Sequence, residues 1–77
     1  MKVRYDFHGY RPHQAEMEIE DLIYRRDKSE DYEVEAITGN GVIRSAIVDL
    51  LDCVGIEWTS DGLNLGKISF MLYKEKK

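Results

Sequence analysis

Thr38-Gly39-Asn40-Gly41 separates two apolar segments whose residues are spaced differently. Residues 34–37 are typical of a strand, whereas apolar side chains after the glycines recur at helical spacing, at Val42, Ile43, Ile47, Leu50 and Leu51. The segment therefore predicts a strand, a tight turn and a helix. Two glycines within four positions favour a left-handed backbone or a close approach to another group. Because the first amides of a helix lack intrahelical partners, the turn is a candidate anion site; the alternative is a connection that binds nothing.

The composition predicts one small domain spanning residues 1–77. Hydrophobic residues make up 43% of the 77 residues, which is enough for a single core. No apolar run approaches the roughly 20 residues of a membrane span, and the N-terminus lacks the apolar stretch of a signal peptide. The single Cys53 cannot form an internal disulfide, and we expect it to be a small buried thiol in the second helix. These features predict a cytoplasmic protein.

The charge balance does not by itself favour a nucleic-acid partner. Fifteen acidic residues outnumber eleven basic ones, for a net charge of −4. Phosphate backbones are bound by clustered Lys and Arg, so such a partner requires positive charge gathered on one face.

The order of elements predicts an α/β fold. Pro12 suits the first position of a helix that carries the apolar stripe Ala15, Ile19, Leu22 and Ile23, although Arg11 is a poor N-cap. Strands are expected at 3–7, 32–37, 56–59 and 67–73, and a turn at 60–62. One helix is expected from Pro12 until the polar segment 25–31 closes it, and a second at 42–54. This is a β-α-β-α-β-β order, which predicts a mixed four-stranded sheet and two helices in a two-layer α/β sandwich.

The first two strands bring distant residues together. Strands joined by a helix are usually parallel, so their carboxyl ends lie at one edge of the sheet, where open α/β sheets tend to bind ligands. Asp6 and His8 end the first strand, and residues 38–41 end the second. We therefore expect these residues to share one shallow site.

Asp6 and His8 are a candidate acid–base pair. Side chains two positions apart in a strand point to the same face, and a carboxylate beside an imidazole can fix its tautomer and raise its pKa. In the alternative interpretation, Asp6 caps local amides and His8 packs at a turn.

Two cations are candidates for phosphate contacts at the same edge. Arg44 lies in the first turn of the second helix, where a cation opposes the helix dipole unless an anion is bound nearby. Lys67 joins the site if the last strand runs antiparallel to its parallel neighbour. Each of these residues can also be an ordinary surface cation.

The remaining charged residues of the first helix are interpreted more simply. Its acidic residues are Glu16, Glu18, Glu20 and Asp21. They are expected to form a solvated face, and a carboxylate metal site is the lesser alternative. His13 is expected to be exposed and without a catalytic role.

Three segments resemble the small MutS-related (Smr) domain family. Tyr5-Asp6-Phe7-His8-Gly9-Tyr10 resembles the family's opening Leu-Asp-Leu-His-Gly. Ile37-Thr38-Gly39-Asn40-Gly41 with Arg44 resembles its second motif, Thr/His-Gly-x-Gly followed by Arg, and residues 66–72 resemble its closing strand. Thr38 stands where many members have His, and Asn40 where a basic residue is common.

The resemblance implies a fold similar to the C-terminal domain of translation initiation factor three. It also implies binding of DNA or RNA and, as in several members, a nicking endonuclease activity in DNA repair, recombination or RNA processing. By this carry-over, Asp6 and His8 are catalytic, and the phosphate is held by Thr38, Gly39, Asn40, Gly41 and Arg44. One imidazole is a small catalytic set, so hydrolysis would require a divalent metal such as magnesium or a second protein group.

Two non-catalytic functions stay open at this point. A nucleic-acid or nucleotide-phosphate binder would keep the glycine turn and Arg44 without the acid–base role. A protein-interaction module of a larger repair or translation protein would instead show an exposed apolar patch around Tyr10, Tyr24 or Trp58.

Overall fold

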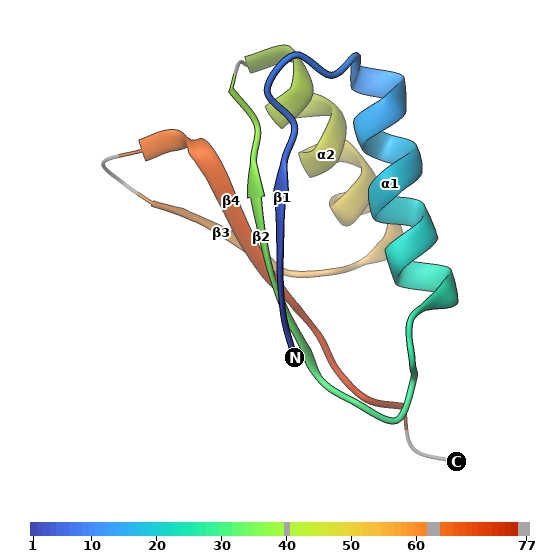
Figure 1. Ribbon diagram of the computed structural model, residues 1–77. Helices are drawn as coiled ribbons and strands as arrows, with labels where there is room; N and C mark the ends of the chain where they lie inside the picture. Colours follow the sequence, from blue (N-terminus) through green and yellow to red (C-terminus); the bar gives the residue numbers. More distant parts are fainter. Residues whose placement is uncertain (40, 62–63, 76–77) are drawn as a thin grey trace.

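The computed structural model describes residues 1–39, 41–61 and 64–75 and has the predicted order of elements. The elements are β1 (Lys2–Asp6), α1 (Pro12–Arg25), β2 (Tyr32–Ile37), α2 (Gly41–Val54), β3 (Trp58–Asp61) and β4 (Asn64–Leu72). Figure 1 shows a two-layer arrangement in which both helices cover one face of the sheet and leave the other face open. The predicted β-α-β-α-β-β fold is confirmed.

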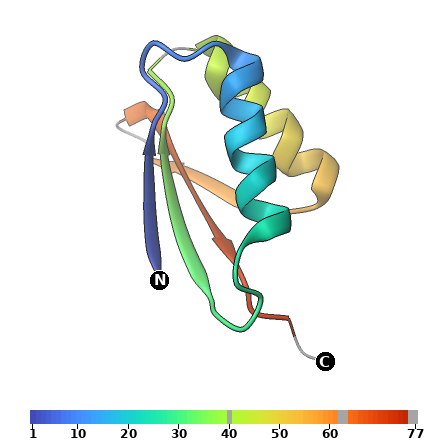
Figure 2. The ribbon, with the colours of Figure 1, turned by 45° about the vertical axis from the view of Figure 1, so that its right-hand side comes forward.

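The sheet is mixed, with the strand order β1-β2-β4-β3. β1 and β2 are parallel, whereas β4 is antiparallel to both β2 and β3. As a result, the carboxyl ends of β1 and β2 and the start of β4 lie at the same edge, which both views of the ribbon show at the top (Figures 1 and 2).

The core lies between the sheet and one stripe of each helix. Ala15, Ile19 and Ile23 form the buried face of α1, and Ile43, Ile47 and Leu51 form that of α2. Alternate residues of the strands complete the core because successive side chains point to opposite faces; they include Tyr32, Val34, Ala36, Ile68, Phe70 and Leu72. Phe7, directly after β1, is also buried there. In the part of the chain that the structure describes, neither helix is long and apolar enough to cross a bilayer.

The ends of both helices follow from local hydrogen bonds. At the start of α1, the side chain of Gln14 accepts a hydrogen bond from the N–H of Arg11 at 3.0 Å, which is the half of a capping box that needs no acceptor on the N-cap side chain. At the end of α2, Gly55 has a φ of 90°, and the N–H of Ile56 donates to the carbonyl of Leu51. A left-handed glycine at this position ends a helix without steric strain.

The last two strands differ from the predicted ranges. β3 begins at Trp58 rather than residue 56, because the N–H of Ile56 is used in the cap of α2. Ser60 and Asp61 belong to β3 instead of a turn, and β4 begins at Asn64, three residues before the predicted Lys67. Gly62, the last residue of the predicted turn, lies outside the described residues.

Two side chains that the sequence places in the apolar pattern of α2 are exposed, and burial was expected of one of them, Cys53. The buried face follows Ile43, Ile47 and Leu51, which are four residues apart, and neither Val42 nor Cys53 falls on it. Val42 is 66% exposed, and Cys53 is also exposed. The prediction of a buried thiol was therefore wrong.

Candidate phosphate-binding rim

The turns that follow β1 and β2 meet at one edge of the sheet. The N–H of Phe7 donates to the carbonyl of Ile37 at 2.8 Å, so the two chains stay paired just beyond β1. His8 then lies directly against Gly39: a Cβ atom placed on Gly39 would be 3.5 Å from His8 Nδ1 and 3.6 Å from His8 Cα. The predicted meeting of these segments is confirmed. We call the surface formed by His8, Gly9, Gly39 and Gly41 the rim.

The turn that carries His8 is fixed by its own backbone. Gly9 has a φ of 82°, and the N–H of Tyr10 donates to the carbonyl of Phe7 at 2.9 Å. The Asp6 carboxylate accepts the main-chain N–H of His8 at 3.0 Å. Among the described residues, no hydrogen bond joins this carboxylate to the His8 ring. The structure thus shows Asp6 in the amide-capping arrangement, and the exposed imidazole of His8 is not oriented by it.

Thr38 holds the end of β2 in place. Its side chain is fully buried, and its hydroxyl donates to the carbonyl of Gly66 at 3.0 Å. Its N–H donates to the same carbonyl at 2.6 Å. Thr38 therefore joins β2 to β4 instead of presenting its hydroxyl to a phosphate, as the resemblance had implied.

The glycines of the second turn differ in their roles. Gly39 has a φ of 74°, a left-handed conformation that strains any residue with a side chain. Gly41 is exposed and is the first residue of α2. Asn40 lies outside the described residues. The N-termini of α1 and α2 both lie at this edge (Figure 1) and contribute partial positive charge there.

Arg44 does not join the rim. Its guanidinium carbon lies 5.4 Å from the centre of the Trp58 ring, and its Nε is buried without a hydrogen-bond partner. Trp58 belongs to β3, the outermost strand on the side of the sheet opposite β1. Across the sheet it is in register with Val3, in the middle of β1 and away from the strand ends that carry the rim. Arg44 is therefore directed away from His8, and its predicted phosphate contact is replaced by an aromatic one.

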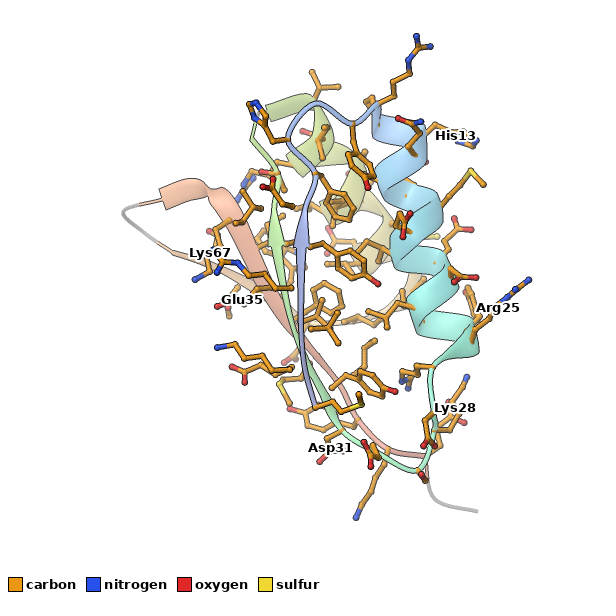
Figure 3. The ribbon with its side chains drawn as sticks, viewed as in Figure 1. His13, Arg25, Lys28, Asp31, Glu35 and Lys67 are labelled. Atoms are coloured by element: carbon orange, nitrogen blue, oxygen red, sulfur yellow. The ribbon has the colours of Figure 1, made fainter. Side chains whose placement is uncertain are left out.

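Lys67 lies at the predicted end of the sheet, but its ammonium group is paired with a carboxylate instead of facing the rim. It pairs with Ile37 across β2 and β4, next to the rim. Its ammonium forms an ion pair with Glu35 at 3.0 Å, and Figure 3 shows both side chains on the open face of the sheet. The hydrogen bond from Lys67 lowers the pKa of the Glu35 carboxyl.

Arg11 is a cation two residues after Gly9 of the rim, and sequence reasoning considered it only as an N-cap. It is exposed and lies between the His8 turn and the first residue of α1. The available signal was its position, because an N-cap rarely carries a side chain without an acceptor. His13 is exposed in the first turn of α1, and Figure 3 shows it on the outer side of the helix.

The acidic side of α1 is solvated for the most part. Glu18, Glu20 and Asp21 are exposed, and Asp21 pairs with Arg25 at 3.1 Å. Burial, followed by the charges of Glu18 and Asp21, raises the pKa of the Tyr5 phenol. Across residues 1–39, 41–61 and 64–75, no group of three or more His, Cys, Asp or Glu side chains is placed to hold a metal ion.

Comparisons with protein-family models, curated proteins and solved structures found no match to this chain.

Proposed function

We propose that this domain binds nucleic acid and holds one backbone phosphate at the rim. The observation that carries the proposal is the contact between His8 and Gly39, which unites two motifs about 30 residues apart in sequence. An imidazole and the main-chain amides at a helix start are both suited to a phosphate oxygen. The resemblance of the same two motifs to the Smr family supports this assignment.

Local charge favours the rim over the rest of this acidic chain. Two helix N-termini and the exposed Arg11 contribute positive potential at one edge, and the exposed ring of His8 can donate a hydrogen bond there. Arg44 and Lys67 are engaged with Trp58 and Glu35, so Arg11 takes the place of the cations that the sequence suggested. With few cations involved, we expect binding to be weak and sensitive to salt.

Fluorescence anisotropy with labelled single-stranded and double-stranded oligonucleotides, measured over a salt series, tests this proposal. We expect Arg11→Gln and His8→Ala to weaken binding, and Arg11→Gln to reduce the salt slope by about 0.7–0.9 for the lost phosphate contact. Arg25→Gln is the matched control, because Arg25 is exposed and lies in the last turn of the same helix. Affinity that does not change with salt concentration would contradict a phosphate site at the rim. Equal losses of affinity in Arg11→Gln and Arg25→Gln would contradict it as well.

Hydrolysis of the bound phosphodiester is a second candidate, favoured by the exposed imidazole beside the proposed phosphate position. His8 would take a proton from the attacking water as a new P–O bond forms. The P–O bond to the leaving oxygen breaks, and that oxygen takes a proton from solvent. Asp6 acts here as a positioning residue, because its carboxylate holds the main chain of His8.

Cleavage of supercoiled plasmid and structured RNA, with and without magnesium, tests the second candidate. His8→Ala should lose cleavage. Asp6→Asn keeps a side-chain oxygen for the His8 N–H, so it should retain more activity than Asp6→Ala if Asp6 only positions the turn. Equal cleavage by wild type and His8→Ala would identify a contaminant and reject hydrolysis by this domain.

A further inference from the structure

A shallow hollow lies beside the rim, between the His8 turn and the outer face of α1. Its volume is about 510 Å³, within the range of about 300–1,000 Å³ that is usual for small-ligand sites. It is lined by His8, Gly9, Tyr10, Gln14, Met17 and Glu18. Since His8 belongs to both surfaces, a ligand in the hollow would be adjacent to a phosphate on the rim.

The apolar part of the hollow is a fixed aromatic ring and a flexible thioether. The Tyr10 ring is 5.2 Å from the Phe7 ring in an edge-on arrangement, and its backbone N–H is bonded to the Phe7 carbonyl. Tyr10 is nevertheless 40% exposed, and Met17 is 55% exposed. A preorganised aromatic ring left open to solvent is suited to stacking with a planar base, with Met17 as an adaptable second contact.

The polar part of the hollow presents donors and acceptors in a defined order. Gln14 and Glu18 are one helical turn apart and so lie on the same face of α1. The Gln14 oxygen accepts the N–H of Arg11, which leaves the amide NH₂ as the group available to a ligand. Within the described residues, no hydrogen bond or ion pair engages the Glu18 carboxylate. The hollow therefore offers an acceptor pair next to a donor.

Guanine is the base whose edge complements this order. Its Watson–Crick edge presents N2–H and N1–H side by side, which match the two oxygens of a carboxylate, followed by the O6 acceptor, which matches an amide NH₂. Adenine and cytosine each place an acceptor nitrogen beside their single amino group, where it would face the carboxylate. Uracil and thymine offer one N–H between two carbonyl oxygens.

We propose that the hollow binds an unpaired guanine of a single-stranded nucleic acid whose adjacent phosphate lies on the rim. The base stacks on Tyr10, Glu18 accepts its N1–H and N2–H, and Gln14 donates to O6. This inference rests on the proposed phosphate site and gives that site a preference for single strands over duplexes, because the guanine edge is hidden by base pairing.

The test compares single-stranded oligonucleotides that are uniform except for one central base, which is G, A, C or T in DNA and G, A, C or U in RNA. Wild type should prefer the G-containing strand by about ten-fold, the range of one good bidentate contact. Glu18→Gln should abolish that preference while leaving affinity for the other strands close to that of the control Glu20→Gln. Each of these two variants removes one negative charge from the same helix. Glu20 is exposed but does not line the hollow, so only Glu18→Gln removes a charge from the proposed guanine site.

A second pair of variants tests the stacking contact. Tyr10→Ala should weaken binding to every single strand by about five-fold or more, whereas Tyr10→Phe, which keeps the ring, should bind like wild type. Circular dichroism establishes that each variant is folded.

The outcomes separate the two proposals. If no oligonucleotide binds, or if Arg11→Gln has no effect, the phosphate site itself is wrong and the guanine site falls with it. If binding depends on salt and on Arg11 but shows no preference for G, or if Glu18→Gln and Tyr10→Ala match their controls, the phosphate site stands and the guanine site is overturned.

Discussion

The guanidinium of Arg44 lies over the ring of Trp58, with 5.4 Å between the guanidinium carbon and the ring centre. This contact ties the first turn of α2 to the edge strand β3. The Trp58 ring is also held at the other end of the helix, where its Nε1 donates to Asp52 at 2.9 Å. One aromatic side chain thus connects both ends of α2 to β3, and Arg44 belongs to this packing rather than to the rim.

Replacing Arg44 should therefore change stability and not nucleic-acid binding. We expect Arg44→Ala to lower the free energy of unfolding by about 0.5–1 kcal/mol through the lost cation–π contact, with an added loss of packing from its partly buried stem. Urea unfolding followed by Trp58 fluorescence measures this, and Arg44→Lys provides the comparison that keeps the charge but loses the planar stack. A large loss of oligonucleotide affinity in a folded Arg44→Ala protein would instead show that Arg44 contributes to binding.

The ion pair between Lys67 and Glu35 should make stability depend on pH. Lys67 holds the folded pKa of Glu35 below its usual value of 4.5, so its stabilising effect is present above pH 4.5 and is lost as the pH falls through the lower folded value. We expect Glu35→Gln to flatten the change in urea midpoint across this acidic window. Asp27, whose pKa is lowered by hydrogen bonds from Ser29, should account for part of the dependence that remains. An unchanged pH profile in Glu35→Gln would show that the pair does not stabilise the fold in solution.

The exposed position of Cys53 predicts an accessible thiol. In the native protein we expect Cys53 to react with a thiol reagent such as DTNB at a rate close to that of the urea-unfolded chain. We also expect oxidation to give a disulfide-linked dimer that reduction reverses. Labelling that requires prior unfolding would show that the C-terminal turn of α2 is packed against another part of the protein and that Cys53 is not exposed in solution.

The order of elements and the meeting of His8 with Gly39 were predictable because both follow from rules about backbones. A helix between two strands makes them parallel, and parallel strands end at the same edge. The partners of Arg44 and Lys67 were not predictable in this way. They depend on Trp58 and on the register that places Glu35 near Lys67, and neither the range of β3 nor that register follows from local spacing.

Within the helices too, the sequence pattern did not establish the surroundings of individual side chains. The stripe of Ile43, Ile47 and Leu51 identified the buried face of α2, but membership in an apolar helix did not establish whether Cys53 lies on that face. Arg11 was considered only as a poor N-cap, yet a residue that is unfavourable for a helix start is informative when it lies near a candidate anion site.

Gly39 and Gly55 offer a matched pair for testing the contact at the rim. Both have left-handed backbones, with φ of 74° and 90°, so Gly39→Ala and Gly55→Ala should each destabilise the fold by about 1–2 kcal/mol through backbone strain. A new methyl group at Gly39 would meet His8, at 3.5 Å from Nδ1, whereas Gly55 follows the last residue of α2 and His8 is not among the atoms within 4 Å of a Cβ there. We therefore expect similar losses of stability by urea unfolding, but a larger shift of the His8 ring resonances by NMR in Gly39→Ala. If Gly55→Ala shifted those resonances as strongly, or if Gly39→Ala left them unchanged, the two turns would not meet as described.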